Sequence, residues 1–174
     1  MLRAASYLRK DLPEAVFFIS KSPNVRPEVY AELLRDLSLK VECPSSSFYE
    51  LVKAMDFAYV ASGTATLETA LIGTPFFLLY KASWSTYLLG KYLIKVPYLG
   101  LVNLLAEDRV VPEFIQQDAH PETLAHEAKV FLQSPELHQK MKAEFRQVRE
   151  KLGEKGASGR AAREVCDFLD RRSN

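Results

Sequence analysis

Short apolar runs alternate with segments of helical periodicity through the first half of the chain. The apolar runs have the length of strands and cover residues 15–20, 39–43, 56–61 and 76–80. The segments in which apolar residues recur every three or four positions begin at residues 2, 27, 47 and 64. This alternation predicts an α/β fold built on a Rossmann-like, doubly wound parallel sheet with helices on both faces.

Local signals mark the ends of two of these helices. Ser47 followed by Glu50 forms a capping-box pattern at the start of one helix, and Gly73 with Pro75 ends the helix that begins at Thr64. The order of elements starts with a helix, whereas such a half-domain normally has a strand before its first helix, near the centre of the sheet. We therefore expect the sheet to lack its first strand, unless another segment substitutes for it.

The second half of the chain is mainly helical in pattern. Residues 96–102 predict one more short strand, and residues 112–116 predict the first turn of a helix. Pro121 and Pro135 open two further helices, and Gly153 ends the second of them. The last segment, 160–172, predicts a helical extension that buries an apolar face made by Ala161, Val165, Phe168 and Leu169.

Composition restricts the classes of function. The 174 residues are 48% hydrophobic, enough for one domain with a core, and the net charge of +1 argues against a dedicated nucleic-acid-binding protein. The two cysteines are far apart and the three histidines are scattered, so no metal-binding spacing is present and no cofactor is expected. No stretch of about 18 uncharged apolar residues exists that would predict a membrane-spanning helix.

The strand-to-helix turn at Ser62, Gly63 and Thr64 is the strongest candidate site. The first amides of a helix lack intrahelical acceptors and attract anions, while glycine lets a phosphate approach the backbone. Glu68 lies one turn further on the face of Thr64, where a carboxylate can accept hydrogen bonds from sugar hydroxyls. The alternative is an ordinary capped helix with a solvated Glu68, and residue types alone do not exclude it.

A second candidate surface is a predicted helix over residues 84–95. Its aromatic and basic side chains share one helical face, and residues 69–106 contain no acidic residue. Such a face suits a membrane–water interface, and it equally suits a helix that packs its aromatic rings on the sheet with its lysines in water. The residues of this face are Trp84, Tyr87, Leu88, Lys91, Tyr92 and Lys95.

Four ordered stretches, residues 61–68, 73–81, 96–106 and 111–118, resemble lipid-A-disaccharide synthase, a bacterial glycosyltransferase of the two-domain GT-B fold. The resemblance implies that this chain is the C-terminal, nucleotide-sugar-binding portion. Residues 1–153 would form that domain and residues 154–174 a crossing helix. Without the partner domain, the apolar face of this helix would be exposed or folded back. The N-terminal acceptor domain and the family's glycine-serine-arginine loop have no counterpart here.

The resemblance also implies the reaction and its site. The complete enzyme would transfer 2,3-diacylglucosamine from its UDP carrier to 2,3-diacylglucosamine 1-phosphate (lipid X), with inversion and release of UDP. The general base would belong to the missing domain, so this chain alone would bind UDP weakly and not turn over. The substrate-binding residues would be Ser62, Gly63, Thr64, Glu68, Asn103 and Gln116, with Glu113 a weaker candidate.

One residue departs from the family pattern, because Glu107 follows the Asn-Leu-Leu-Ala block where relatives usually have glycine. The resemblance further implies a cytoplasmic enzyme, peripheral at the inner membrane, with possible exchange of the C-terminal helix in a homodimer. Two alternatives stay open. One is another GT-B enzyme that uses UDP-N-acetylglucosamine, and the other is a non-catalytic module that docks on nucleotides or membranes.

Overall fold

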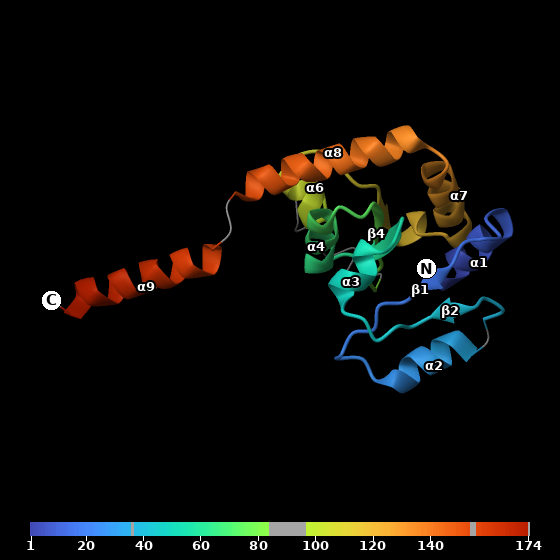
Figure 1. Ribbon diagram of the computed structural model, residues 1–174, viewed down its shortest axis with the longest axis horizontal. Helices are drawn as coiled ribbons and strands as arrows, with labels where there is room; N and C mark the ends of the chain where they lie inside the picture. The colour runs from blue at the N-terminus through green and yellow to red at the C-terminus, as the bar shows by residue number, and fades with distance from the viewer. Residues whose placement is uncertain (36, 84–96, 154–155, 174) are drawn as a thin grey trace.

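Parallel strands alternate with helices in the computed structural model, which describes residues 1–35, 37–83, 97–153 and 156–173 (Figure 1). The described strands form two small parallel sheets, β1–β2 and β3–β4–β5. The predicted α/β class is therefore confirmed. The elements are α1 (Leu2–Asp11), β1 (Phe17–Phe18), α2 (Pro27–Arg35), β2 (Val41–Glu42), α3 (Phe48–Lys53), β3 (Ala58–Ala61), α4 (Thr64–Ile72), β4 (Phe76–Tyr80), α6 (Leu101–Ala106), β5 (Glu113–Ile115), the 3-10 helix η1 (Gln116–Asp118), α7 (Pro121–Leu132), α8 (Pro135–Leu152) and α9 (Ala157–Ser173).

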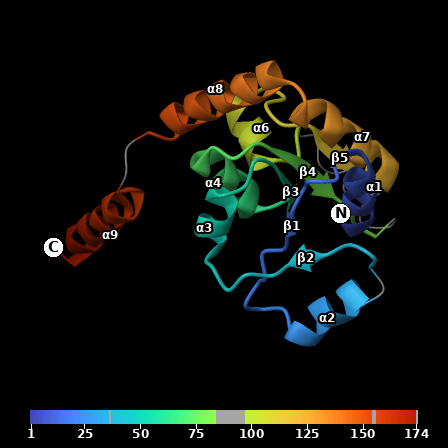
Figure 2. The same ribbon diagram turned by 45° about the vertical axis from the view of Figure 1, so that its right-hand side comes forward.

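The core is built around β4, whose first four residues are all buried. Successive side chains of a strand point to opposite faces. Phe76 accordingly stacks on Phe145 of α8, with ring centroids 5.7 Å apart, while Phe77 contacts Phe131 of α7 at 5.6 Å. Figures 1 and 2 show α4, α6 and α8 on one side of the sheet and α1 with α7 on the other. Burial of each such aromatic ring contributes about 1.5–3 kcal/mol.

The gap between the two sheets follows the expected topology. The doubly wound order 3-2-1-4-5-6 places a first strand between the second and the fourth. β2 and β1 correspond to the third and second strands of that order, and β3, β4 and β5 to the last three. Among the described residues, no strand pairs with both β1 and β3, which is where the sequence predicts that the sheet lacks its first strand.

Two predicted helix ends are confirmed in detail. Ser47 and Glu50 form the capping box: the Ser47 amide donates to Glu50 Oε2 at 3.0 Å, and the Glu50 amide donates to Ser47 Oγ at 3.3 Å. These bonds from Ser47 hold the pKa of Glu50 below its usual range. Gly73 ends α4 in the left-handed conformation, with φ of 95°.

Two predicted elements are wrong. Residues 97–100 are a loop and α6 begins at Leu101, so the part of the predicted 96–102 strand that the structure describes is not a strand. Conversely, Glu113–Ile115 is a strand, paired with Leu78–Tyr80, where the first turn of a helix was predicted. Short apolar runs do not distinguish strand from helix by periodicity. Here strand pairing determines the structure: residues 113–115 form a strand because they pair in parallel with the free edge of β4.

The last turn of α8 holds the carboxyl ends of α4 and α6. Arg149 donates a hydrogen bond to the carbonyl of Leu71, and Lys151 Nζ donates to the carbonyls of Ala106 at 2.9 Å and Leu105 at 3.3 Å. Cations are favoured at helix carboxyl ends, where carbonyls lack intrahelical donors. α8 therefore fixes the two helices whose opposite ends reach the carboxyl edge of the sheet.

The C-terminal helix is confirmed, and its apolar face is exposed, one of the two outcomes expected without a partner domain. In α9 the described side chains are all exposed, and Val165, Phe168 and Leu169 are more than half exposed. Figure 1 shows why: α9 extends away from the body of the chain. The assignment of residues 154–174 as a helix that crosses to another domain stays a prediction, as does the 1–153 domain boundary.

Replacement of Glu107 by glycine is expected to stabilise the fold. Glu107 caps the end of α6 with φ of 61°, a left-handed conformation that costs a side-chain-bearing residue about 1–2 kcal/mol and glycine little. After the greater chain entropy of unfolded glycine is subtracted, Glu107→Gly should raise the free energy of unfolding by about 0.5–1 kcal/mol, measured by urea denaturation.

The matched control is Glu127→Gly, in the exposed interior of α7, which should lower the free energy of unfolding by about 1 kcal/mol because glycine disfavours helix. An equal loss of stability in both variants would contradict the strain assigned to Glu107.

Candidate functional site

The turn between β3 and α4 is held open by its glycine. Gly63 has φ of 148° and ψ of −166°, a region essentially restricted to glycine. Its carbonyl accepts two hydrogen bonds from Thr66, from the hydroxyl at 2.7 Å and from the amide at 3.2 Å. Gly63 and Thr64 are exposed, and a Cβ on Gly63 would meet nothing within 4 Å. The backbone here is therefore both rigid and accessible to a ligand.

The amino end of α4 carries no internal counter-charge. No side chain caps it, and its first turn contains no acidic residue. By contrast, Ser47 and Ser134 cap α3 and α8, and each of those helices has a glutamate in its first turn. Unpaired amides and the helix dipole attract an anion at such an end. Glu68, half-buried, lies one turn further along α4.

At the amino end of α6, in contrast, the chain supplies its own anion. The carboxylate of Glu113, on β5, accepts from the amides of Leu99 at 3.0 Å and Gly100 at 2.9 Å. Gly100 is packed so closely that a Cβ would lie 2.5 Å from Leu78 Cδ1 and 3.1 Å from Glu113 Oε1. Sequence reasoning missed this contact because it placed Glu113 on a helix.

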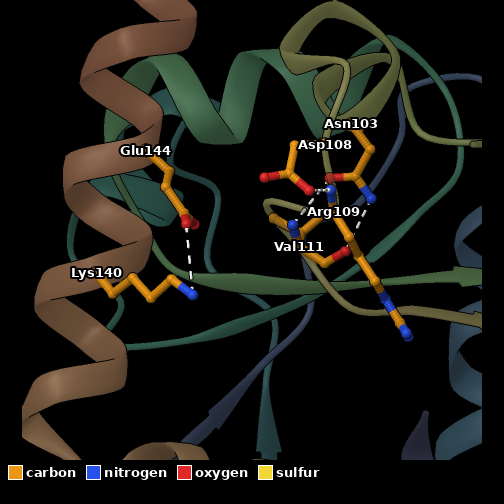
Figure 3. Close-up of polar contacts among 6 residues, drawn as sticks. All are labelled: Asn103, Asp108, Arg109, Val111, Lys140 and Glu144. Carbon is orange, nitrogen blue, oxygen red and sulfur yellow. Dashed lines mark hydrogen bonds and ion pairs between the residues drawn. The ribbon is translucent and has the colours of Figure 1, made fainter.

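Asn103 is fully buried, and both the nitrogen and the oxygen of its side-chain amide form hydrogen bonds within the protein. Its Nδ2 donates to the Val111 carbonyl at 2.8 Å and to Glu113 Oε1 at 2.9 Å, and its Oδ1 accepts from the Val111 amide at 2.9 Å. Figure 3 shows this side chain reaching across to the segment that leads into β5. Asn103 therefore joins α6 to β5, and a direct contact with a ligand stays a prediction.

Gln116 continues the pairing of β4 and β5 with its side chain. Beyond the last paired residues, Tyr80 and Ile115, Gln116 Nε2 donates to the Ala82 carbonyl at 3.0 Å and Oε1 accepts from the Ala82 amide at 2.8 Å. Gln116 has φ of 50°, an uncommon backbone conformation for a residue with a side chain. The residue thus holds the segment that leaves β4.

The structure brings most of the predicted site to the carboxyl edge of one sheet. β3 leads into Ser62, β4 into Lys81 and β5 into Gln116, and the strand order is β3–β4–β5. The start of α1 also lies near this edge, because burial and then the charge of Lys81 lower the pKa of the Met1 amino group. Asn103 alone among the predicted site residues lies inside the core.

A cavity between α7 and α8 lies away from this edge. It encloses about 200 Å³ near the start of β4. Its walls include Phe77 and Phe131, and its rim carries Arg109 and Glu144, the latter in a 3.8 Å ion pair with Lys140 (Figure 3). Burial raises the pKa of Glu144. No predicted site residue lines this cavity, so it adds nothing to the carboxyl-edge site.

The structure bears only in part on two further features considered in the sequence, contact with a membrane and metal binding. The aromatic and basic face at 84–95 lies outside the described residues. Within the described ranges, no helix combines the length and apolar character needed to cross a bilayer, and no group of three or more His, Cys, Asp or Glu side chains is placed to hold a metal ion.

Known proteins resemble the chain over nearly its whole length. The family model described as lipid-A-disaccharide synthetase matches residues 1–165. Lipid-A-disaccharide synthase of Geobacter sulfurreducens is 37% identical over 97% of this chain and 44% of its own length. The enzyme of the same name from Syntrophus aciditrophicus is 40% identical over 93% of this chain and 43% of its own length. The chain therefore spans less than half the length of these relatives.

Removal of the Asn103 side chain should be costly. Asn103→Ala would leave the buried amide and carbonyl of Val111 without side-chain partners, and each unsatisfied buried group costs about 1–3 kcal/mol. We expect a loss of about 2–4 kcal/mol in the free energy of unfolding, measured by urea denaturation. Leu104→Ala, at an exposed neighbour on α6, is the control and should cost under about 1 kcal/mol. Similar losses for both would contradict the role given to Asn103.

Proposed function

Because the chain belongs to the lipid-A-disaccharide synthetase family, we propose that it forms the UDP-sugar-binding half of a glycosyltransferase of lipid A biosynthesis. The complete enzyme would move 2,3-diacylglucosamine from UDP to lipid X with inversion, giving the disaccharide and UDP. The part of the relatives that this chain does not span would supply the acceptor site and the general base. We expect no transfer by this chain alone.

The observation that carries the proposal is the unneutralised amino end of α4. Its rigid glycine turn presents backbone amides to solvent, while Glu113 already fills the corresponding end of α6. A nucleotide diphosphate carries the charge and the acceptor oxygens that such an end binds. When the bond to the sugar breaks, negative charge grows on the departing diphosphate, and preorganised amides at Gly63 and Thr64 would stabilise that charge. The Ser62 amide is already bound to the Leu79 carbonyl, so Ser62 would contribute its hydroxyl instead of the amide expected from the sequence.

Glu68 would bind the ribose. A carboxylate one turn behind the phosphate-binding amides can accept hydrogen bonds from two adjacent sugar hydroxyls while it stays clear of the phosphates. Asn103 and Gln116 would complete the site by holding α6, β5 and the exit of β4 in place, as their contacts support. No metal or cofactor is needed in this scheme.

The location and partners of the enzyme follow from its substrates. Both sugars carry acyl chains, so we propose a peripheral position at the cytoplasmic face of the bacterial inner membrane. The exposed apolar residues of α9 support contact with another domain or exchange in a homodimer. Each of these stays part of the proposal.

UDP titration tests the function. The chain should bind UDP weakly, with a Kd on the order of 1 mM, since it spans less than half the length of its relatives. Glu68→Ala should raise that Kd about tenfold, equivalent to about 1.4 kcal/mol, because the ribose hydroxyls lose their acceptor. Gly63→Val should also weaken binding, since a side chain would stand between the phosphates and the amides. Calorimetry and ligand-observed NMR measure both.

Glu127→Ala, at an exposed site on α7, is the matched control and should leave UDP binding unchanged. Absence of UDP binding by the unchanged chain at millimolar concentration would favour the interaction-module alternative. Equal binding by Glu68→Ala and the control would remove Glu68 from the site.

A further inference from the structure

The residue that follows β4, Lys81, lies at the middle of the carboxyl edge. β3 and β5 flank β4 on its two sides, so their ends border it. The Ser62 amide donates to the Leu79 carbonyl at 3.0 Å, which continues the β3–β4 ladder beyond its last pair, Ala61 and Leu79. One step further along this register sets Gly63 alongside Lys81. Adjacent strands are about 4.8 Å apart, so the backbone of Lys81 lies close to the Gly63 turn.

The backbone around Lys81 is held on both sides. Tyr80 is the last residue of the β4–β5 ladder, paired with Ile115, and Ala82 is bound through both its amide and its carbonyl by Gln116. The positive φ of Gln116 is the conformation from which its amide makes both bonds. These two bonds use one Nε2 hydrogen and one Oε1 lone pair of Gln116. Through them Gln116 acts on the site by way of the segment that it holds.

The charge of Lys81 is not neutralised by the described parts of the chain. It is exposed, and none of the ion pairs among the described residues includes it. The amino end of α1 approaches it closely enough for its charge to lower the pKa of the Met1 amino group. Neither α1 nor α4 has an acidic residue in its first turn. Positive charge and two helix amino ends thus gather at one edge, where an anion is favoured.

We propose that Lys81 is the cation that binds the diphosphate of the nucleotide-sugar, and that Gln116 is the positioning residue that aims it. This inference rests on the proposed function and adds residues to the same site. Lys81 supplies the point charge, and the turn at Gly63 supplies the oriented amides. Uridine lacks the diphosphate, so the two parts of the ligand can be tested separately.

The experiment titrates the chain with UDP and with uridine. Lys81→Met should raise the Kd for UDP at least tenfold and leave the Kd for uridine within twofold, because uridine lacks the diphosphate. Lys81→Arg, which keeps the charge, should retain most of the UDP affinity. Lys53→Met, at an exposed position on α3, is the control and should behave like the unchanged chain.

Gln116 is tested by a pair of variants. Gln116→Gly removes the side-chain amide but leaves a residue that adopts a positive φ easily. Gln116→Ala removes the amide and also leaves a residue for which a positive φ is unfavourable. If Gln116 acts by positioning Lys81, both should weaken UDP binding several-fold and spare uridine, and neither should weaken UDP binding further in a Lys81→Met background. A simple loss of stability would instead shift the unfolding midpoint without separating UDP from uridine.

Three results would overturn the inference. Lys81→Met could bind UDP as tightly as the Lys53→Met control, or it could lose uridine and UDP equally. If Gln116→Gly binds UDP as tightly as the unchanged chain, Gln116 has no positioning role. If Glu68→Ala still weakens UDP binding in these cases, the proposed function stands and only the role of Lys81 or Gln116 fails. If the unchanged chain binds no UDP, both fail.

Discussion

Burial of β4 on both of its faces is the constraint on which the described structure depends. Phe76 and Leu78 face the layer of α4, α6 and α8, while Phe77 and Leu79 face the layer of α1 and α7. When helices cover both faces of a strand, the neighbouring strands in the sheet are covered by the same two helix layers. β3 and β5 take these places, and as a result the ends of all three strands meet at one edge.

The amino ends of α4 and α6 differ in whether the chain supplies a negative charge there. That difference separates a contact within the protein from a candidate binding site. Two helices, α4 and α6, lie on the same side of the sheet (Figure 1) and are held at their carboxyl ends by α8. At α6 the chain provides its own carboxylate, and this glutamate also orients a buried asparagine. At α4 it provides glycine and hydroxyl side chains only. The difference in charge, rather than the presence of a helix end as such, makes the α4 turn the candidate site for a ligand.

The class of fold and the α4 turn could be predicted from the sequence because their signals are local. An apolar run of strand length, a capping box and a glycine at a helix end need only neighbouring residues. The segment 97–115 could not be predicted in the same way. Its leucine-rich part suits a helix or a strand, and the choice depends on Glu113 and Asn103, ten residues apart, meeting in three dimensions. Glu113 was assigned to a helix for the same reason: the free edge of β4, which takes residues 113–115 as a strand, is not visible in local sequence.

The gap between the two sheets has a consequence for how the chain behaves in concentrated solution. Among the described strands, β1 pairs only with β2, and β3 pairs only with β4, so each retains one row of backbone donors and acceptors without a strand partner. Unprotected rows of this kind are templates for intermolecular β-pairing. The chain in isolation is therefore expected to self-associate through added strands.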